Sequence, residues 1–342
     1  MQYVVIIYLF LAILLYFLLG GADFGAGIIE LVTSKRNRNK TRTVAYHAIG
    51  PIWEANHMWL IIAIVILFVG YPQVYSAMSL YLHIPLLAML MGIIARGTAF
   101  VFRSYDAVKD EMQRVYNRIF ILSSCITPLF LGIIAASAIS GTVDANANDF
   151  LQAYIFSWLH WFSITVGLFT VALSGFLAAI YLIGEAEDDN TRNRFIRKAR
   201  MMNIAAVIFG ALVFIAAGVE GIPLVHWIFG NVYGLSAVIL ASISLVILWV
   251  LIYKGYKNVI RVLAGFQVTM ILFSIGYSQF PNFIIVKNGA SFSLLQNQAN
   301  QKTIDALGWA LLIGSVIILP FLGYLLYSFQ KEPVTNDAAI EA

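Results

Sequence analysis

Three charged side chains stand inside stretches that are otherwise apolar, all within the first hundred residues. They are Asp23, Glu54 and Arg96. A charge that is kept away from water is costly unless it has a partner of opposite charge, so such residues are candidates for a functional site. Two carboxylates and one guanidinium could hold each other in place, and a carboxylate could also take up and release protons.

Asp23 lies within a glycine-rich segment, residues 20–27, with the sequence Gly-Gly-Ala-Asp-Phe-Gly-Ala-Gly. Gly21 and Gly25 have the small-xxx-small spacing that lets two helix backbones approach closely. Close packing alone explains these glycines. It does not explain Asp23, which lies about 15 Å of helix before the end of its apolar run.

Glu54 lies in residues 50–60, with the sequence Gly-Pro-Ile-Trp-Glu-Ala-Asn-His-Met-Trp-Leu. Glu54 and His57 are one turn apart and share a helix face. The same spacing occurs in di-iron bundles, but these need the motif on two helices plus further carboxylates. Because one copy is present, the sequence predicts no metal site and favours a proton-path or packing role. The other residues that define the motif are Trp53, Asn56 and Trp59.

Arg96 begins the segment Arg-Gly-Thr-Ala-Phe-Val-Phe-Arg, residues 96–103. Arg96, Phe100 and Arg103 share one stripe of a helix. An unpaired arginine at the membrane centre costs about 3 kcal/mol or more, so Glu54 or Asp23 is expected as its partner. The alternative is that the Arg96 side chain extends toward water without a functional partner.

His83 and His160 each lie a few residues from one end of an apolar run. Their similar depths would suit the two axial ligands of one b-type haem. The alternative is that each histidine hydrogen-bonds across helices, as intramembrane histidines commonly do. Neither flanking sequence adds a second sign of haem binding.

The elements that carry these residues must be membrane helices. The 342 residues are 61% hydrophobic and 11% charged, whereas soluble domains carry about one quarter charged residues. Several apolar runs exceed the roughly 20 residues that cross a bilayer, and lipid excludes open sheets. The expected helices are 3–33, 49–71, 77–103, 117–139, 155–184, 202–219, 230–253, 258–280 and 304–329.

The distribution of lysine and arginine predicts the orientation of these helices. Five lie in residues 35–42, four in 103–118, five in 192–200, three in 254–261, and one is Lys331; the alternate connections hold two, and Arg96 is intramembrane. Cytoplasmic loops are rich in lysine and arginine. The N-terminus is therefore expected outside the cell and the C-terminus in the cytoplasm.

The chain is expected to form a single membrane domain, residues 1–330, followed by a short cytoplasmic tail, 331–342. The basic residues lie in short clusters between apolar runs and not along one soluble face, so nucleic-acid binding is not expected. The N-terminal run lacks the basic start and cleavage site of a signal peptide, so the first helix is expected to persist. Cys125, the single cysteine, cannot form a disulfide within the chain.

In their order and spacing, the motifs at 21–25, 50–60 and 96–103 resemble the signature of cytochrome bd oxidase subunit II. Beyond them the resemblance extends along the chain as helix number and length. Many members of the family carry Asp where this chain has Glu54, and Glu where it has Val101. The first difference keeps an acid, and the second removes one.

The resemblance implies an all-α fold of two four-helix bundles plus a peripheral helix, paired with a haem-bearing subunit I in the bacterial cytoplasmic membrane. This chain would bind no haem itself; subunit I would carry b-type haems and, in one form of the family, a d-type haem. The complex oxidises quinol and reduces dioxygen to water. Some complexes include a small single-helix accessory subunit.

The resemblance also implies that this subunit lines part of a cytoplasmic proton route. Glu54 is then expected at the proton entry and Asp23 as a deeper station, with Arg96 setting their electrostatics. The Gly21/Gly25 seam and the first three helices are expected to face subunit I.

Two other classes of function are consistent with the same residues. A secondary transporter with a site near the bilayer midplane would also use a glycine-interrupted helix with Asp23, Glu54 and Arg96 nearby. Such transporters usually have a second interrupted helix, and Gly175, the best candidate, has no adjacent charge. A purely structural membrane scaffold would lose stability, but no specific activity, when these charges are removed.

Overall fold

The structure is a computed structural model of the chain, and it describes residues 1–50, 53–105, 111–144, 146–147, 149–287 and 291–331. Within these residues, nine helices are long and apolar enough to cross a membrane. This agrees with the predicted number and helical fold class. Pro51 of the second motif lies outside the described residues, as does all of the predicted tail, 331–342, except Lys331.

The first span is a continuous helical rod made of three segments. It consists of α1, Gln2–Leu15, a π-helical segment η1, Tyr16–Gly20, and α2, Gly21–Leu31. Residues Gly21 to Glu30 of α2 are all buried. A π-helical turn widens the backbone by one residue and is found frequently at functional sites.

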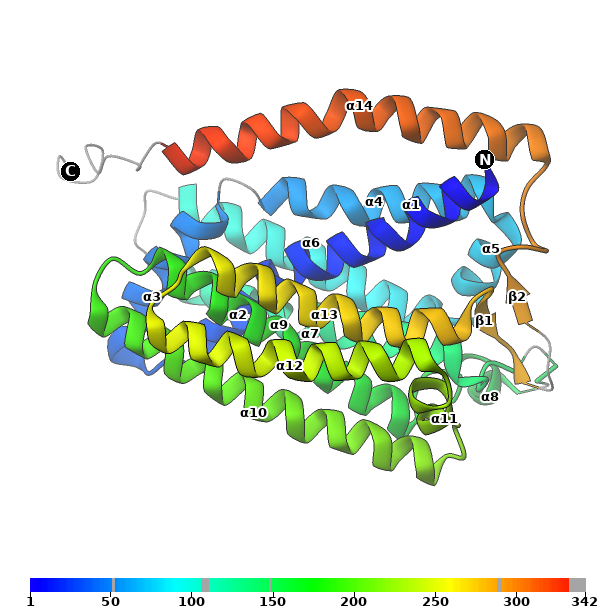
Figure 1. The fold of residues 1–342 in the computed structure, drawn as a ribbon, viewed down its shortest axis with the longest axis horizontal. Coiled ribbons are helices and arrows are strands. Elements are labelled where there is room, and N and C mark those ends of the chain that lie inside the picture. Colours follow the sequence, from blue (N-terminus) through cyan, green and yellow to red (C-terminus); the bar gives the residue numbers. More distant parts are fainter. Residues whose placement is uncertain (51–52, 106–110, 145, 148, 288–290, 332–342) are drawn as a thin grey trace.

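The remaining spans are long helices that run nearly side by side (Figure 1). They are α4, Trp53–Gly70, α6, His83–Tyr105, α7, Glu111–Ser140, α9, Trp161–Glu185, α10, Asp189–Val219, α12, Val232–Lys254, α13, Asn258–Gln279, and α14, Gln301–Lys331. The glycines at Gly132 and Gly167 allow α7 and α9 to touch, since a side chain there would overlap the neighbouring helix.

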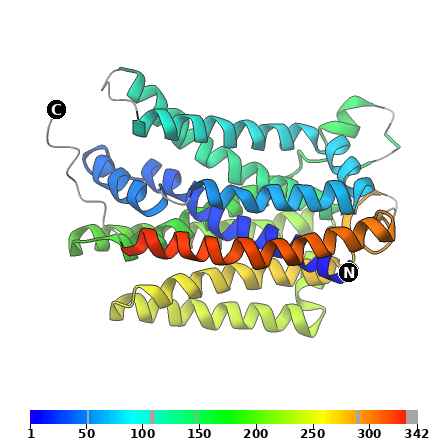
Figure 2. The same cartoon turned by 90° about the horizontal axis from the view of Figure 1, so that it is seen from above.

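The spans form two groups of four helices with one helix outside them. The first rod packs with α4 and α7, and α6 packs with α7 and reaches the rod through the Arg96 side chain, while α9 packs with α10 and α13, and α13 packs with α12. The close packing of α2 and α7 against α9 joins the two groups. Helix α14 lies along α1 and α4, and only a small share of its span is buried (Figures 1 and 2).

Short elements cover the end of the molecule at which the N-terminus lies (Figure 1). They are α5, Pro72–Tyr81, α8, Phe150–Tyr154, α11, Leu224–Phe229, and an antiparallel hairpin of β1, Asn282–Ile285, and β2, Ser291–Ser293. Residues Ile284 and Val286 of this region are buried. These elements close one end of the apolar core.

Several predicted helix boundaries need correction, among them the starts of the third span, at His83 and not at 77, and of the fourth, at Glu111 and not at 117. Residues 35–49, expected mostly as a loop, form α3, Lys35–Ile49, and the sixth span begins at Asp189 and not at 202. Both segments are rich in arginine and lysine, so their helices extend beyond the apolar runs on which the prediction rests. In the fifth span, helix α9 begins at Trp161 and not at 155, because His160 has extended backbone and caps the helix.

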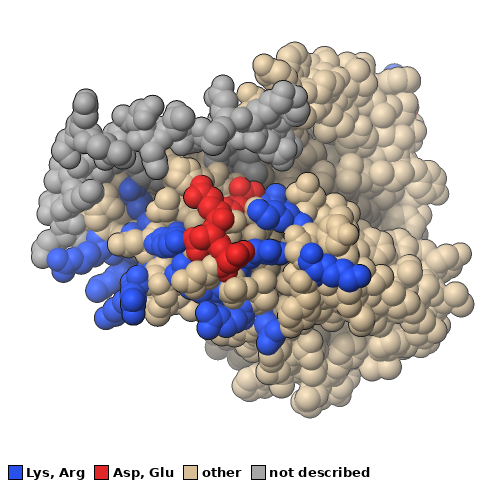
Figure 3. All heavy atoms as spheres, turned by 60° about the vertical axis from the view of Figure 1, so that its left-hand side comes forward, with Lys and Arg blue, Asp and Glu red and all other residues tan. Residues whose placement is uncertain are grey.

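Lysine and arginine side chains gather at the end of the molecule opposite the N-terminus (Figure 3). Helix α3, the start of α10 and the turn between α12 and α13 meet there; Lys40 contacts Asp188, and Arg192 lies next to Gly255. We call this surface the basic end. Its clustering matches the sequence pattern, and the assignment of this end to the cytoplasm stays a prediction.

Candidate functional site: buried ion pairs between the first and third spans

Asp23 and Arg96 form a fully buried, bidentate ion pair. The two terminal guanidinium nitrogens of Arg96 donate to the Asp23 carboxylate at 2.6 and 2.8 Å. One of them, Nη2, also donates to the Asp23 carbonyl oxygen at 3.0 Å. Arg96 Nε donates to Ser124 Oγ at 3.2 Å. Of the two expected partners of Arg96, the structure therefore selects Asp23. This pairing lies about 12 Å of helix from the end of α2 at Leu31.

Aromatic rings enclose this ion pair. The Arg96 guanidinium lies over Phe24 and Phe120, at 5.1 and 4.9 Å from the ring centroids. Cation–π contacts of this kind are strongest where water is excluded. The imidazole of His57 also borders the carboxylate, with Nε2 at 3.7 Å from Asp23 Oδ2. Asp23 thus faces one permanent cation and one titratable group.

A second buried carboxylate lies one step nearer the basic end. Glu30 accepts from Arg103 at 2.9 Å and from Arg42 of α3 at 2.5 Å. Arg103 and Glu30 are both buried, while Arg42 is partly exposed. Since two cations share one carboxylate, this second pair keeps a surplus of positive charge.

The two pairs form a ladder between α2 and α6. Asp23 and Glu30 are seven residues apart, as are Arg96 and Arg103, so each set occupies one face of its helix. Glu30 was not among the predicted site residues, because it lies beyond the glycine-rich motif. Its spacing of seven from Asp23, matched by the spacing of the two arginines, was the signal in the sequence.

Glu54 stands apart from this ladder. Its side chain is exposed at the start of α4, and it makes no ion pair with any residue that the structure describes. The expected alternative pairing of Glu54 with Arg96 is therefore wrong. The exposed position suits a group that exchanges protons with water or with another subunit.

The rest of the second and third motifs forms the wall of the site. The Trp53 ring packs on Phe100 at 5.3 Å and on His57 at 6.1 Å between centroids. Gly97 of α6 provides room for the Trp53 ring. Asn56 is buried and Trp59 is partly buried. These contacts fix α4 against α6 and thereby position His57.

The glycine seam packs within the chain. A Cβ atom at Gly25 would lie 2.0 Å from the Ser174 carbonyl oxygen of α9, and one at Gly21 would lie 3.5 Å from Ser174 Oγ. Gly25 is thus required for the contact between α2 and α9. The expectation that this seam faces a partner subunit is wrong, because α9 already covers it.

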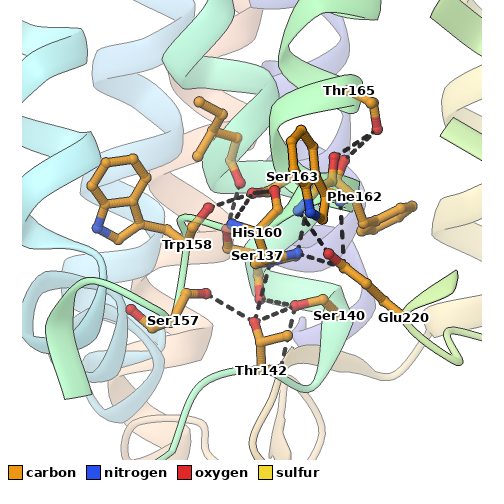
Figure 4. A network of polar contacts seen from close by, with 12 residues as sticks. Ser137, Ser140, Thr142, Ser157, Trp158, His160, Phe162, Ser163, Thr165 and Glu220 are labelled. Atoms are coloured by element: carbon orange, nitrogen blue, oxygen red, sulfur yellow. Dashed lines mark hydrogen bonds and ion pairs between the residues drawn. The ribbon is translucent and has the colours of Figure 1, made fainter. Parts of the chain in front are cut away.

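A second polar cluster, which Figure 4 shows from close by, lies at the end of the molecule opposite the basic end. The Glu220 carboxylate accepts from the backbone N–H groups of Trp161 and Phe162 at 2.6 and 3.3 Å, and lies 2.8 Å from His160 Nδ1. His160 Nε2 lies 3.3 Å from Thr142 Oγ1, which donates to the Ser157 carbonyl. Glu220 therefore caps the first turn of α9.

The family profile described as "Cytochrome bd terminal oxidase subunit II" matches residues 1–329. The chain belongs to this family. Among relatives, the cytochrome bd ubiquinol oxidase subunit 2 of Bacillus subtilis is 26% identical over 342 residues, 94% of each chain. The cytochrome bd-I ubiquinol oxidase subunit 2 of Escherichia coli K12 is 27% identical over 167 residues, 47% of this chain and 43% of the relative.

A solved structure shows the same fold. A chain of bd oxidase from Geobacillus thermodenitrificans superposes with a TM-score of 0.73 at 18% identity, covering 96% of this chain and 98% of that one. Together with the nine apolar helices, membership of the subunit II family makes this a multi-pass protein of a bacterial membrane.

The cytochrome bd family implies haems in the complex, and the alternative that His83 and His160 form one pair of haem ligands fails at His160. Both ring nitrogens of His160 are engaged, with Glu220 and Thr142. His83 Nδ1 bonds to the Leu80 carbonyl and its ring packs on Tyr154. The described residues also contain no group of three His, Cys, Asp or Glu that could hold a metal ion.

Proposed function

We propose that this chain is the subunit of a cytochrome bd-type quinol oxidase that supports a haem-bearing subunit I and contributes to proton uptake from the cytoplasm. The observation that carries the proton role is the buried Asp23–Arg96 pair with His57 beside it. Such a site is costly to build inside a membrane, so its presence indicates a function. A scaffold needs no buried titratable group there.

The directness of the Asp23–Arg96 pair decides which groups would move protons. Both oxygens of the Asp23 carboxylate accept hydrogen bonds from Arg96, so neither is free to take up a proton in transit. We therefore assign Asp23 to the charge balance of the site and not to the deeper proton station that the sequence suggested. Arg96 balances that charge and fixes its orientation.

His57 is the better carrier. An imidazole can accept a proton on one nitrogen and release one from the other. Its Nε2 lies 3.7 Å from Asp23 Oδ2, so one ring nitrogen borders the ion pair and the other is free to face away from it. Glu54, exposed one turn earlier on α4, would take protons from the cytoplasmic side and pass them toward His57.

The basic end supports the orientation of this route. The ladder lies between the basic end and the centre of the first span, and the predicted cytoplasmic side is the basic one. Protons would thus travel only part of the way across the membrane. Such a short route fits the delivery of protons to oxygen reduction in the partner subunit.

The oxidase assignment is tested by purification from the native membrane. A tag on this subunit should co-purify a haem-bearing protein, and the purified complex should consume oxygen when quinol is added. Recovery of this chain alone, without oxygen consumption, would favour the transporter or scaffold alternatives.

The proton role is tested with Glu54→Gln and, as control, Glu54→Asp in that complex. Because Glu54 is exposed and unpaired within the described chain, Glu54→Gln should leave the melting temperature and haem spectra unchanged. Its turnover should fall about 100-fold, the lower end of the range for a lost proton-transfer group, and Glu54→Asp should keep most activity. Normal turnover of Glu54→Gln would remove Glu54 from the route.

A further inference from the structure

Tyr16 is a buried side chain next to the ion pair that the proposed route does not yet use. It opens the π-helical segment Tyr16–Gly20, one residue beyond the end of α1. Its ring packs edge-on against Phe24 at 6.3 Å and lies 6.1 Å from the His57 ring, centroid to centroid. Phe24 and His57 are themselves 5.7 Å apart. The three rings therefore surround one side of Asp23.

Gly20 determines where the Tyr16 ring lies. A Cβ atom at residue 20 would be 3.1 Å from Cε2 and 3.2 Å from Cδ2 of that ring. The tyrosine side chain therefore folds along the helix over Gly20, in the direction of Asp23. The Tyr16 hydroxyl is buried and so does not face lipid, and its ring lies beside Phe24 and His57 of the site.

Two polar atoms on this side of the site have no partner in the protein. The Tyr16 hydroxyl and His57 Nδ1 are both buried, and neither makes a hydrogen bond with any residue in the described part of the chain. Tyr16 as a whole is 3% exposed. Buried polar atoms are nearly always hydrogen-bonded, either to protein or to ordered water. Two such atoms on neighbouring rings form a polar site that suits water.

We infer that the Tyr16 hydroxyl and His57 Nδ1 bind ordered water between them, and that Tyr16 is the group with which His57 exchanges protons. This inference rests on the proposed proton role of the subunit. It adds a water site and a third side chain to that role. Tyr16 does not need to ionise, since a hydroxyl can accept a hydrogen bond and donate one at the same time.

Each transfer conserves protons. His57 takes one proton on Nε2, on the side of Asp23, and releases one from Nδ1 to the water. The water passes a proton to the Tyr16 oxygen as the tyrosine gives its own hydroxyl proton to a second water molecule on the other side of that oxygen. Every group returns to its starting protonation state once the water and ring have reoriented, and no electron moves.

The test is Tyr16→Phe in the purified oxidase complex. The substitution removes one oxygen atom that bonds to no described residue, so haem spectra and melting temperature should match the wild type. Oxygen consumption should fall about 100-fold, the lower end of the range for the loss of one proton-transfer group. The ratio of rates in H2O and D2O should rise, because proton transfer then limits turnover.

Tyr71→Phe is the matched control. Tyr71 is also fully buried, its hydroxyl also lacks a partner in the described part of the chain, and it lies beyond α4 at the opposite end of that helix. Its substitution should change neither the rate nor the isotope ratio. Equal rates and isotope ratios for Tyr16→Phe and wild type would overturn the inference.

A second measurement applies if Tyr16→Phe fails to assemble. An experimental map of the wild-type complex at a resolution that shows ordered water should contain a water peak within hydrogen-bond distance of both Tyr16 Oη and His57 Nδ1. Absence of that peak would overturn the inference. The inference and the proposed function fail separately. If Glu54→Gln is slow while Tyr16→Phe is normal, the proposed function stands and only the role of Tyr16 is wrong.

Discussion

The two polar regions of this subunit differ in how their charges are satisfied. At the far end, Glu220 caps the first turn of α9 and holds His160, and helix-end N–H groups need such an acceptor. Between the first and third spans, Asp23 and Arg96 lie inside the bundle, away from any helix end. The need to cap a helix explains Glu220. No such structural need explains Asp23, so function should be sought in the region around Asp23.

Among the substitutions in the two regions, removal of Arg96 should have the largest effect on stability. Arg96→Met leaves the Asp23 carboxylate buried and without its arginine, which costs about 3–5 kcal/mol. The melting temperature of the purified complex should fall strongly. The double variant Asp23→Leu/Arg96→Met should recover much of the loss, because no charge is then stranded. Unchanged melting of Arg96→Met would show that water already reaches the pair.

Arg103→Met should have a smaller effect at the other rung of the ladder. Glu30 keeps its contact with Arg42, so the loss is that of one charged hydrogen bond, about 1.5–3 kcal/mol. Thermal melting of Arg103→Met beside Arg96→Met gives the comparison. If both variants melted equally, the surplus positive charge around Glu30 would have no stabilising role.

Glu220→Gln should cost less again. The amide oxygen can still accept from the α9 backbone, so the expected loss is that of a weakened cap, about 1 kcal/mol. Turnover should stay at the wild-type level, since this cluster has no part in the proposed route. A large loss of oxygen consumption in Glu220→Gln would end the functional distinction between the two regions.

The smallest expected effect is a pH dependence at His160. Burial lowers the pKa of His160 below its ordinary value of 6.5, and the hydrogen bond and charge of Glu220 oppose that shift. Below pH 6.5 the unfolded chain binds more protons than the folded one, so stability is lost as the pH falls toward the folded pKa. The difference between the melting temperatures at pH 7.5 and pH 5.5 should be smaller in His160→Gln than in the wild type. An equal difference in the two proteins would exclude His160 as the source of the pH dependence.

The apolar runs were enough to predict the nine spans, because lipid requires long helices whatever their detailed sequence. Helix α3 was missed, since its arginine-rich sequence lacks an apolar run and its contacts with α2 and α9 come only from the fold. The Asp23–Arg96 pair could be expected from the cost of two buried charges. The exposure of Glu54 could not, because helix rotation depends on the packing of Trp53 against Phe100.

The partners of Glu30 and Glu220 show the limit of local motifs. Glu30 contacts Arg103, 73 residues away, and Glu220 contacts His160, 60 residues away. Glu220 belongs to no recognisable local pattern, and the seven-residue spacing of Glu30 from Asp23 gains its meaning only beside the matching spacing of Arg96 and Arg103. Their roles become clear only when the helices are placed side by side.

Proton uptake in the purified complex tests the distinction between the two regions most directly. Fully reduced oxidase is mixed with oxygen in a weakly buffered solution that contains a pH-indicator dye, and the rate of proton uptake is measured during a single turnover. His57→Gln and His160→Gln make the same chemical change in each region. His57→Gln should slow uptake about 100-fold with unchanged haem spectra, while His160→Gln should take up protons at the wild-type rate. Wild-type uptake in His57→Gln, or slowed uptake confined to His160→Gln, would contradict the assignment of the proton route to the buried ion pairs.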